Sequence, residues 1–597
     1  MSKPFRTALV LALALSLPAI AGPPQPTSGS AAGRPGGAPG AASKRGADLV
    51  IRGAAVYTMD AVRRWAEAIA IKGDRIVYAG PDGGIADYVG ARTRVLELPG
   101  TMIVPGFQDA HVHPVSGGVG YLGCALYGLV GRDAYLQAVA DYAAKHPDKP
   151  WIRGEGWQLS AFAPTGVPDR RLLDGVVPDR PVYLESSDGH SAWVNSKALA
   201  AAGITKETPD PAGGRIDRYP KTGEAVGGLQ DSAMDLVTAA MPAITAQEKI
   251  DGLRYALKML NGFGITSFQD ASVNLDGDTS YRSIDTYRTL DRENELTARV
   301  VASLWWDRHR GEEQIPAFLE ARRKYTRDNL RATTVKIMQD GVMEVQTAAM
   351  LEPYVGKPGV RGLTMVEPEA LKRAVTTLDR EGFQVHFHAI GDAAIRQCLD
   401  AVEAARRANG TRDGRHHISH LELIDPADIP RFRRLDVIAN FQPLWAYADD
   451  YITELTLPFL EARRARWLYP IASVLRTGAV VAFGSDWSVS SANPLEEIET
   501  AVTRMGALGE TDTPFIPEER IGLADALAAF TINAAYVNFQ EDRTGSIEVG
   551  KLADLAVLDR NLFTIPPKQI SDAKVVLTLL GGKPVHGDLE ALTKKEK

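Results

Sequence analysis

The central part of the chain alternates short apolar strands with amphipathic helical stretches, and this alternation restricts the fold more than any other feature. Strands that alternate with helices indicate parallel βαβ units. Eight such strands predict an α/β fold of the (β/α)₈ TIM-barrel class, in which active sites lie at the C-terminal ends of the strands. The predicted strands are 102–104, 264–268, 299–304, 334–338, 384–387, 417–421, 437–441 and 479–483.

Two further segments distort this barrel, which we place at 105–541. The first two predicted strands are too far apart for a single crossover, so about 117–247 is an insertion, expected to form a lid or substrate domain. Short strands also occur at both ends of the chain, and neither set is large enough to be stable alone. We therefore predict one composite β-sandwich, formed by 47–104 together with 542–590.

The N-terminal residues differ in kind from the rest. Lys3 and Arg6 precede an apolar run at 8–17, and small residues follow at 19–21, which is the pattern of a secretory signal peptide over 1–21. The run is too short for a membrane span. Residues 22–46 are rich in Gly, Pro, Ala and Ser and predict a flexible linker. We expect an exported protein, periplasmic or secreted, without a stable membrane anchor.

Composition limits the classes of partner. A formal net charge of −7 leaves no basic footprint, so nucleic acid is not expected as a partner. The two cysteines, Cys124 and Cys398, cannot form a disulfide framework. These features indicate an enzyme that acts on a small-molecule substrate, and they leave a homo-oligomer open.

Histidines gather at the C-terminal ends of three predicted strands. His111 and His113 are two residues apart, so on a strand both rings point to the same face. Imidazole is a good ligand for Zn, Fe or Ni, although two hydrogen-bonded core histidines would show the same spacing. The other two clusters are His386/His388 and His416/His417/His420.

In the second and third clusters, the position of each histidine along its strand distinguishes the expected metal ligands from the other histidines. His388 lies nearer the open end than His386, so we interpret His388 as a ligand and His386 as a deeper hydrogen-bonding neighbour. His420 ends its strand and is also interpreted as a ligand. His417 has the opposite parity and is expected to face outward, whereas the role of His416 stays open.

Two charged residues occupy unusual places. Asp486 follows the eighth predicted strand, where a carboxylate can bind a metal and shuttle a proton, or else cap the next helix. Lys336 lies inside an apolar strand, and a buried lysine needs a partner or a depressed pKa. It either pairs with Asp340 or reacts with CO₂ to form a carbamate, an anionic ligand that would bridge two metal ions.

Two residues of the insertion are candidates for substrate contacts. His190 lies in the polar stretch SDGHSAW at 187–193, and Trp157 ends the stretch GEGW at 154–157. The alternatives are a structural loop histidine and an aromatic residue that merely packs in the lid.

Several motifs, in a characteristic order, resemble the amidohydrolase superfamily, specifically its amidohydrolase-3 branch of YtcJ-like metal-dependent hydrolases. They are PGFQDAHVHP at 105–114, VKIMQDGVMEVQTAAMLEPY at 335–354, HAIGDAA at 388–394, HISHLELI at 417–424 and FGSDWSV at 483–489. The resemblance extends over about 48–586.

The resemblance implies a distorted barrel with a composite sandwich, one or two divalent metal ions with zinc as the expected metal, and hydrolysis of C–N bonds. His111 and His113 match the ligands of the first strand, and His388 and His420 match those of the fifth and sixth strands. Asp486 matches the catalytic aspartate of the eighth strand, which also binds metal, and Lys336 matches the fourth-strand lysine that can be carbamylated.

This chain departs from the family pattern at two places. Ser419 precedes the sixth-strand histidine where relatives usually have Glu, and Asp231 stands where relatives have the longer Glu. Both changes concern supporting or substrate contacts rather than the metal ligands.

The expected function is therefore an exported metal-dependent hydrolase that uses a metal-activated hydroxide. Its substrate would be an amide, an N-formyl or N-acyl compound or a cyclic amide, cleaved at a C–N bond other than a peptide bond. The alternatives are a metal-dependent isomerase on the same barrel and a non-catalytic binding protein that retains the fold.

Overall fold

The computed structural model describes residues 46–275, 283–327 and 329–594. The predicted signal peptide, 1–21, and all of the predicted linker except residue 46 lie outside these residues. In the described part of the chain, no helix is long and apolar enough to cross a membrane.

Eight parallel strands form the central sheet, in which each strand pairs with the next one along the chain. They are β6 (Phe107–Val112), β13 (Ile265–Val273), β14 (Arg299–Trp305), β15 (Leu330–Met338), β16 (Gln384–Ala389), β17 (His417–His420), β18 (Ile438–Phe441) and β19 (Val481–Phe483). The strands are buried almost throughout, as expected for a parallel sheet covered by helices. Asn440 Nδ2 donates to Ala110 O at 3.0 Å and connects β18 with β6 near the closure. The predicted barrel class is confirmed.

The helices around this sheet begin and end where local signals place them. α6 (Ala246–Gly262) begins with a capping box, in which Thr245 and Glu248 satisfy each other's backbone N–H groups. α9 (Pro368–Arg380) starts with proline at its first position, and α10 (Asp392–Asn409) ends before Gly410, whose φ is +79°. These helices return the chain between consecutive strands of the barrel.

One predicted barrel strand was wrong. β5 (Met102–Pro105) pairs with β1 (Leu49–Tyr57) and β20 (Leu555–Leu558), so it belongs to the terminal sheet rather than to the barrel. The first barrel strand is β6, which begins immediately after Gly106. Both runs are apolar, and hydrophobicity alone does not tell which sheet a strand joins.

The two ends of the chain build a single eight-stranded sheet. Its order is β22-β21-β20-β5-β1-β2-β3, with β4 on β1. The remaining strands are β2 (Trp65–Lys72), β3 (Arg75–Gly80), β4 (Arg94–Glu97), β21 (Val575–Leu580) and β22 (Lys583–His586). A buried ion pair joins this sheet to the barrel, because Arg299 Nε of β14 lies 2.7 Å from Asp554 Oδ2.

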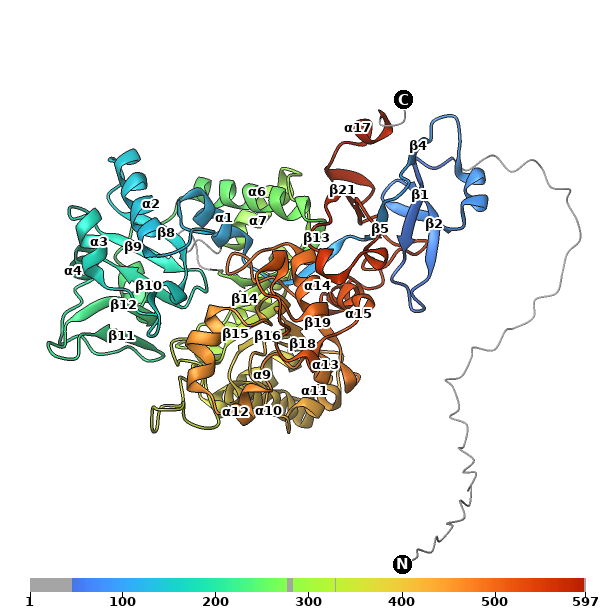
Figure 1. The fold of residues 1–597 in the computed structure, drawn as a ribbon. Coiled ribbons are helices and arrows are strands. Elements are labelled where there is room, and N and C mark those ends of the chain that lie inside the picture. The colour runs from blue at the N-terminus through green and yellow to red at the C-terminus, as the bar shows by residue number, and fades with distance from the viewer. Residues whose placement is uncertain (1–45, 276–282, 328, 595–597) are drawn as a thin grey trace, which may run out of the picture. The chain divides into compact units, whose positions relative to one another are not determined.

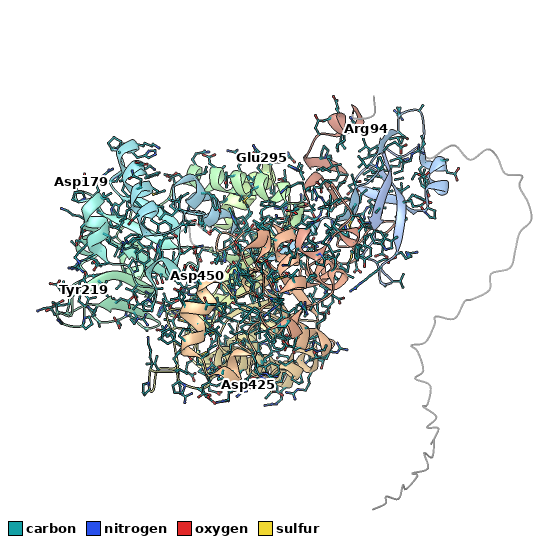
Figure 2. All side chains as sticks on the ribbon, viewed as in Figure 1. Arg94, Asp179, Tyr219, Glu295, Asp425 and Asp450 are labelled. Atoms are coloured by element: carbon teal, nitrogen blue, oxygen red, sulfur yellow. The ribbon has the colours of Figure 1, made fainter. Side chains whose placement is uncertain are left out.

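The insertion forms a third sheet beside the barrel (Figure 1). Its order is β11-β12-β10-β9-β8-β7, and Figure 2 shows Asp179 and Tyr219 on the side of the insertion that lies away from the barrel. Tyr451 ties this unit to the barrel side, since its hydroxyl accepts a hydrogen bond from Leu159 N at 3.0 Å. The strands are β7 (Cys124–Ala125), β8 (Ile152–Trp157), β9 (Val182–Ser186), β10 (Ser191–Val194), β11 (Gly214–Arg218) and β12 (Ala225–Asp231).

Candidate metal centre and active-site pocket

The end of β6 and the segment after β19 bring two imidazoles and a carboxylate together. Asp486 Oδ1 lies 3.2 Å from His111 Nε2 and 2.9 Å from His113 Nε2. Two backbone hydrogen bonds hold these segments side by side, from Asp486 N to His111 O at 2.7 Å and from His113 N to Trp487 O at 2.8 Å. One potential ligand atom from each of the three residues lies within 4.8 Å of the others.

His388 and His420 complete the cluster from β16 and β17. The ring of His420 lies 4.7 Å from that of His111 and 4.5 Å from that of His388, centroid to centroid. His420 Nδ1 is 3.9 Å from Asp486 Oδ2. The backbone of His420 has a φ of +78° and that of Asp486 a φ of +53°, conformations that cost free energy and often occur at functional sites.

The protonation state of these histidines fits metal ligation. Burial lowers the pKa of His111, His388 and His420 well below its usual value, and the charge of Lys336 adds to this effect. The rings are therefore neutral and carry a lone pair, which a divalent metal requires. His111 Nε2, His420 Nδ1 and both nitrogens of His388 are buried without a hydrogen-bond partner. Neutral imidazole nitrogens together with one carboxylate suit zinc or a similar divalent ion.

Asp486 remains ionised in this buried place. Burial alone would raise its pKa, but the contact with His113 and the nearby positive charge of Lys336 hold the pKa below the ordinary value. An ionised carboxylate at this point can bind a metal or accept a proton.

Polar groups below the cluster support it. His386 Nε2 lies 2.9 Å from His111 Nδ1 and 2.8 Å from Ser419 Oγ, so His386 has the deeper hydrogen-bonding position that the sequence predicts. Ser419 uses its short side chain to hold that ring. Asp340 Oδ1 lies 3.3 Å from His388 Nδ1, and burial raises the pKa of Asp340 to about 7 although three backbone N–H groups donate to it.

The prediction that His417 faces outward is wrong. Its ring packs 4.1 Å from that of His386, so His417 and Ser419 share the face of β17 that points into the barrel. His420 reaches the site because its left-handed backbone interrupts the alternation of the strand. His416 is structural: its Nδ1 accepts a hydrogen bond from Val385 N at 3.0 Å, and its Nε2 faces Asp379.

A cavity of about 420 Å³ opens onto the cluster. Lys336 lies in its wall and is 3% exposed, and it is the register partner of His386 on the neighbouring strand. The insertion supplies other parts of the wall, including Glu155, Asp188 and His190.

His190 is fixed against a carboxylate in this wall. Its Nδ1 lies 2.7 Å from Asp231 Oδ1, and its ring is 5.1 Å from the ring of His388. Burial alone would lower the pKa of His190, but the hydrogen bond and charge of Asp231, with the charge of Asp188, raise the pKa to about 9. His190 is therefore a cation at neutral pH. Asp231 is the partner of its Nδ1, which leaves Nε2 as the other ring nitrogen with a proton.

Trp157 does not support the predicted substrate contact. It is fully buried, is not part of the cavity wall, and its indole N–H donates to Leu184 O at 2.9 Å. Its ring instead packs against Phe162 and Trp193. The register of β8 shifts between Glu155 and Trp157, at Gly156 with a φ of +103°, so Trp157 leaves the face of Glu155 and enters the core of the insertion. Glu155 and Gln158 line the cavity.

Sequence reasoning missed the acidic part of the cavity wall. Glu344, Glu422 and Asp449 all line the cavity, together with Tyr451 and Tyr469. Glu344 and Glu422 lie inside the quoted motifs, but nothing in their spacing indicates that loops from different strands bring them together.

Known proteins match this chain over most of its length. A family model described as "Amidohydrolase family" matches residues 94–586. The chain is 34% identical to "Protein LONG AFTER FAR-RED 3" of Arabidopsis thaliana, over 90% of this chain and 92% of the relative. It is 28% identical to the putative amidohydrolase YtcJ of Bacillus subtilis, over 89% and 98%. It is 26% identical to the N-substituted formamide deformylase of Arthrobacter pascens, over 90% and 97%.

Solved structures share the fold. An uncharacterized metal-dependent hydrolase from Pyrococcus horikoshii has a TM-score of 0.67 at 21% identity, over 87% of this chain and 99% of that one. The atrazine chlorohydrolase TrzN from Arthrobacter aurescens, complexed with zinc, has a TM-score of 0.51 at 17% identity, over 91% and 98%.

Proposed function

Because the chain belongs to the amidohydrolase family and is a metal-dependent hydrolase of that family, we propose that it cleaves a C–N bond of an amide, an N-formyl or N-acyl compound or a cyclic amide. The observation that carries this proposal is the convergence of His111, His113 and Asp486 at the floor of a cavity. The deformylase among the relatives acts, by its name, on N-substituted formamides, which supports the same class of bond.

His111, His113, His388, His420 and Asp486 are the residues that would hold the metal. A divalent ion there supplies an acidified water, with a pKa near 7 in favourable zinc sites, and polarises a carbonyl oxygen. Zinc is the proposed ion because neutral imidazoles with one carboxylate suit it, and because TrzN of the same fold is complexed with zinc. Lys336, if carbamylated, would add a bridging oxygen ligand for a second ion.

Asp486 moves the proton in the proposed reaction. Its ionised carboxylate accepts the proton of the attacking water and returns it to the leaving nitrogen, which would otherwise depart as an unstable amide anion. The backbone hydrogen bond from Asp486 N to His111 O, at 2.7 Å, fixes the segment that carries this carboxylate.

His190 binds the substrate carbonyl in this proposal. Its charged ring presents Nε2 to the cavity while Asp231 holds Nδ1, so an N–H donor is preorganised where negative charge develops. Such a donor strengthens its hydrogen bond as the carbonyl oxygen gains charge.

The test of the function is a substrate panel. Metal-loaded protein is incubated with N-substituted formamides, N-acyl amino acids and cyclic amides, and the released amine and acid are quantified. Release of both from one class supports the proposal. A rearranged product without cleavage would indicate an isomerase. If the metal-loaded protein cleaved no member of the panel, the hydrolase proposal would be contradicted.

The variant His190→Gln is expected to lower kcat by about 10²–10³-fold, because it removes a charged donor to the developing oxyanion. Asp231→Asn is expected to lower kcat less, and Asp231→Glu to restore most of it, since Glu keeps the charge that orients His190. Metal content should be unchanged in all three variants. Equal losses in Asp231→Asn and Asp231→Glu would assign Asp231 to packing rather than to positioning.

We also propose export, to the periplasm or the medium, on the strength of the N-terminal pattern at 1–21. N-terminal sequencing of protein recovered from each cell fraction tests this. We expect an exported chain that begins close to residue 22, and an intact Met1 on cytoplasmic protein would contradict export.

A further inference from the structure

We propose that the cavity holds an acidic subsite that binds an organic ammonium group of the substrate. The acidic subsite is formed by Glu344, Glu422 and Asp449, with Asp188 beside them, and all four line the cavity. This inference rests on the proposed function, because it names the substituent that a hydrolysed amide would carry.

The carboxylates of the acidic subsite have no cation of their own. Among the described residues, no arginine or lysine lies within ion-pair distance of Glu344, Glu422 or Asp449. Glu422 is 1% exposed, and its Oε1 is buried without a hydrogen-bond partner. Glu344 is also buried, and the charges of Asp188 and Asp449 act against its ionisation. Buried carboxylates gathered without a counter-charge are costly unless a bound cation offsets their repulsion.

The positive group whose charge acts on Glu344 already has a carboxylate partner. The charge of His190 acts on Glu344, but the ring of His190 is held by Asp231 at 2.7 Å. One imidazolium shared among these carboxylates does not balance them. Burial and the charges of neighbouring carboxylates raise the pKa of Glu344 and of Asp449, so a cation bound between them would stabilise their ionised forms.

The occupant is an organic cation rather than a metal ion. In the described part of the chain, His111, His113 and Asp486 form the group of potential ligands whose atoms converge within 4.8 Å. Among the described residues, Glu344, Glu422 and Asp449 do not form such a group, so the structure shows no preformed metal site among these carboxylates. A larger cation can contact carboxylates that lie around it.

Aromatic rings complete the environment of the acidic subsite. Tyr447, Tyr451 and Tyr469 line the same cavity, and the charges of Glu344 and Glu422 act on the hydroxyl of Tyr469. Tyr451 is held in place by the hydrogen bond from Leu159 N. Aromatic faces combined with carboxylates are the surroundings that alkylammonium groups prefer.

The acidic subsite opens onto the same cavity as the metal centre. His190 connects them, since its ring is 5.1 Å from that of His388 and its charge acts on Glu344. A substrate with its amide at the metal centre can therefore place an ammonium substituent among the carboxylates.

The experiment compares two formamides that differ only in charge. One carries a trimethylammonium group on a butyl chain, and the other carries the uncharged tert-butyl isostere. We expect kcat/KM to be about tenfold or more higher for the charged substrate. Glu344→Gln and Asp449→Asn should each reduce this preference severalfold. Glu454→Gln, an exposed control on the segment that carries Tyr451, should leave it unchanged.

Binding of pentyltrimethylammonium, measured by calorimetry, separates the two proposals, because this cation can neither ligate a metal nor be hydrolysed. Binding that weakens in Glu344→Gln and Asp449→Asn supports the acidic subsite even if neither formamide is cleaved, in which case the hydrolase proposal fails. Equal cleavage of both formamides, with no binding of the cation, would overturn the acidic subsite and leave the hydrolase proposal intact. Thermal unfolding and metal content confirm that each variant is folded.

Discussion

Replacing both His111 and His113 by alanine is expected to reduce the metal content of the purified protein to near zero and to abolish turnover. These residues supply two of the imidazole nitrogens around Asp486, at 3.2 and 2.9 Å from its Oδ1. Removing them leaves His388 and His420 with one carboxylate, which is too few ligands in too open an arrangement for tight binding. Inductively coupled plasma mass spectrometry of the protein, after reconstitution and gel filtration, measures the effect.

A matched control is His309→Ala, which removes an exposed histidine and should leave metal content unchanged. Circular dichroism should show the same secondary structure for all proteins, because the barrel strands are held by their ladders and by the apolar core. A double variant that retained a full complement of metal would contradict the assignment of this centre.

The same measurement counts the ions in the unaltered protein. One ion per chain indicates a mononuclear centre without a bridging carbamate. Two ions that fall to one in Lys336→Met would support carbamylation, because methionine cannot form the carbamate that would supply a bridging oxygen.

Asp486→Asn is expected to lower kcat by about 10²–10⁴-fold while the protein still binds metal. Asparagine keeps the shape of the side chain but cannot accept a proton from water. Since four imidazoles remain at the centre, we expect metal content to fall much less than turnover. The measurement is single-turnover and steady-state kinetics on whichever substrate the panel identifies, with metal content determined on the same sample.

The control for this variant is Asp486→Glu, which retains an ionisable carboxylate and should recover part of the lost activity. Retention of a tenth or more of the original kcat by the asparagine variant would contradict a proton-transfer role. The remaining effect would then belong to metal binding alone.

Local patterns in the sequence were sufficient for much of the barrel and for part of the site. Seven of the eight predicted strands overlap barrel strands, because buried parallel strands are short, apolar and separated by capped helices. The pair His111 and His113 could be predicted to meet, since residues two apart share a face at a strand end. The position of Asp486 after β19 placed it at the same end of the barrel.

The tertiary structure decided the other features of the fold and of the site, because long-range pairing and packing leave no periodic pattern in the local sequence. The run 102–105 joins the terminal sheet because it pairs with β20, which lies more than four hundred residues further along the chain. His417 faces inward with Ser419 by strand alternation, whereas His420 reaches the metal centre only because its left-handed backbone interrupts that alternation. Trp157 enters the core of the insertion because three-dimensional packing, rather than its motif, sets its direction.

The acidic subsite also depends on tertiary structure rather than on local sequence patterns. Asp188, Glu344, Glu422 and Asp449 come from four separate segments, and each alone reads as an ordinary surface carboxylate. The sequence by itself determined seven of the eight barrel strands and which histidines stand at their ends, because strand period and chain order are local properties. The closure of the barrel and the seating of the insertion on it decided which charges share one cavity, because electrostatic repulsion and burial depend on distance in space.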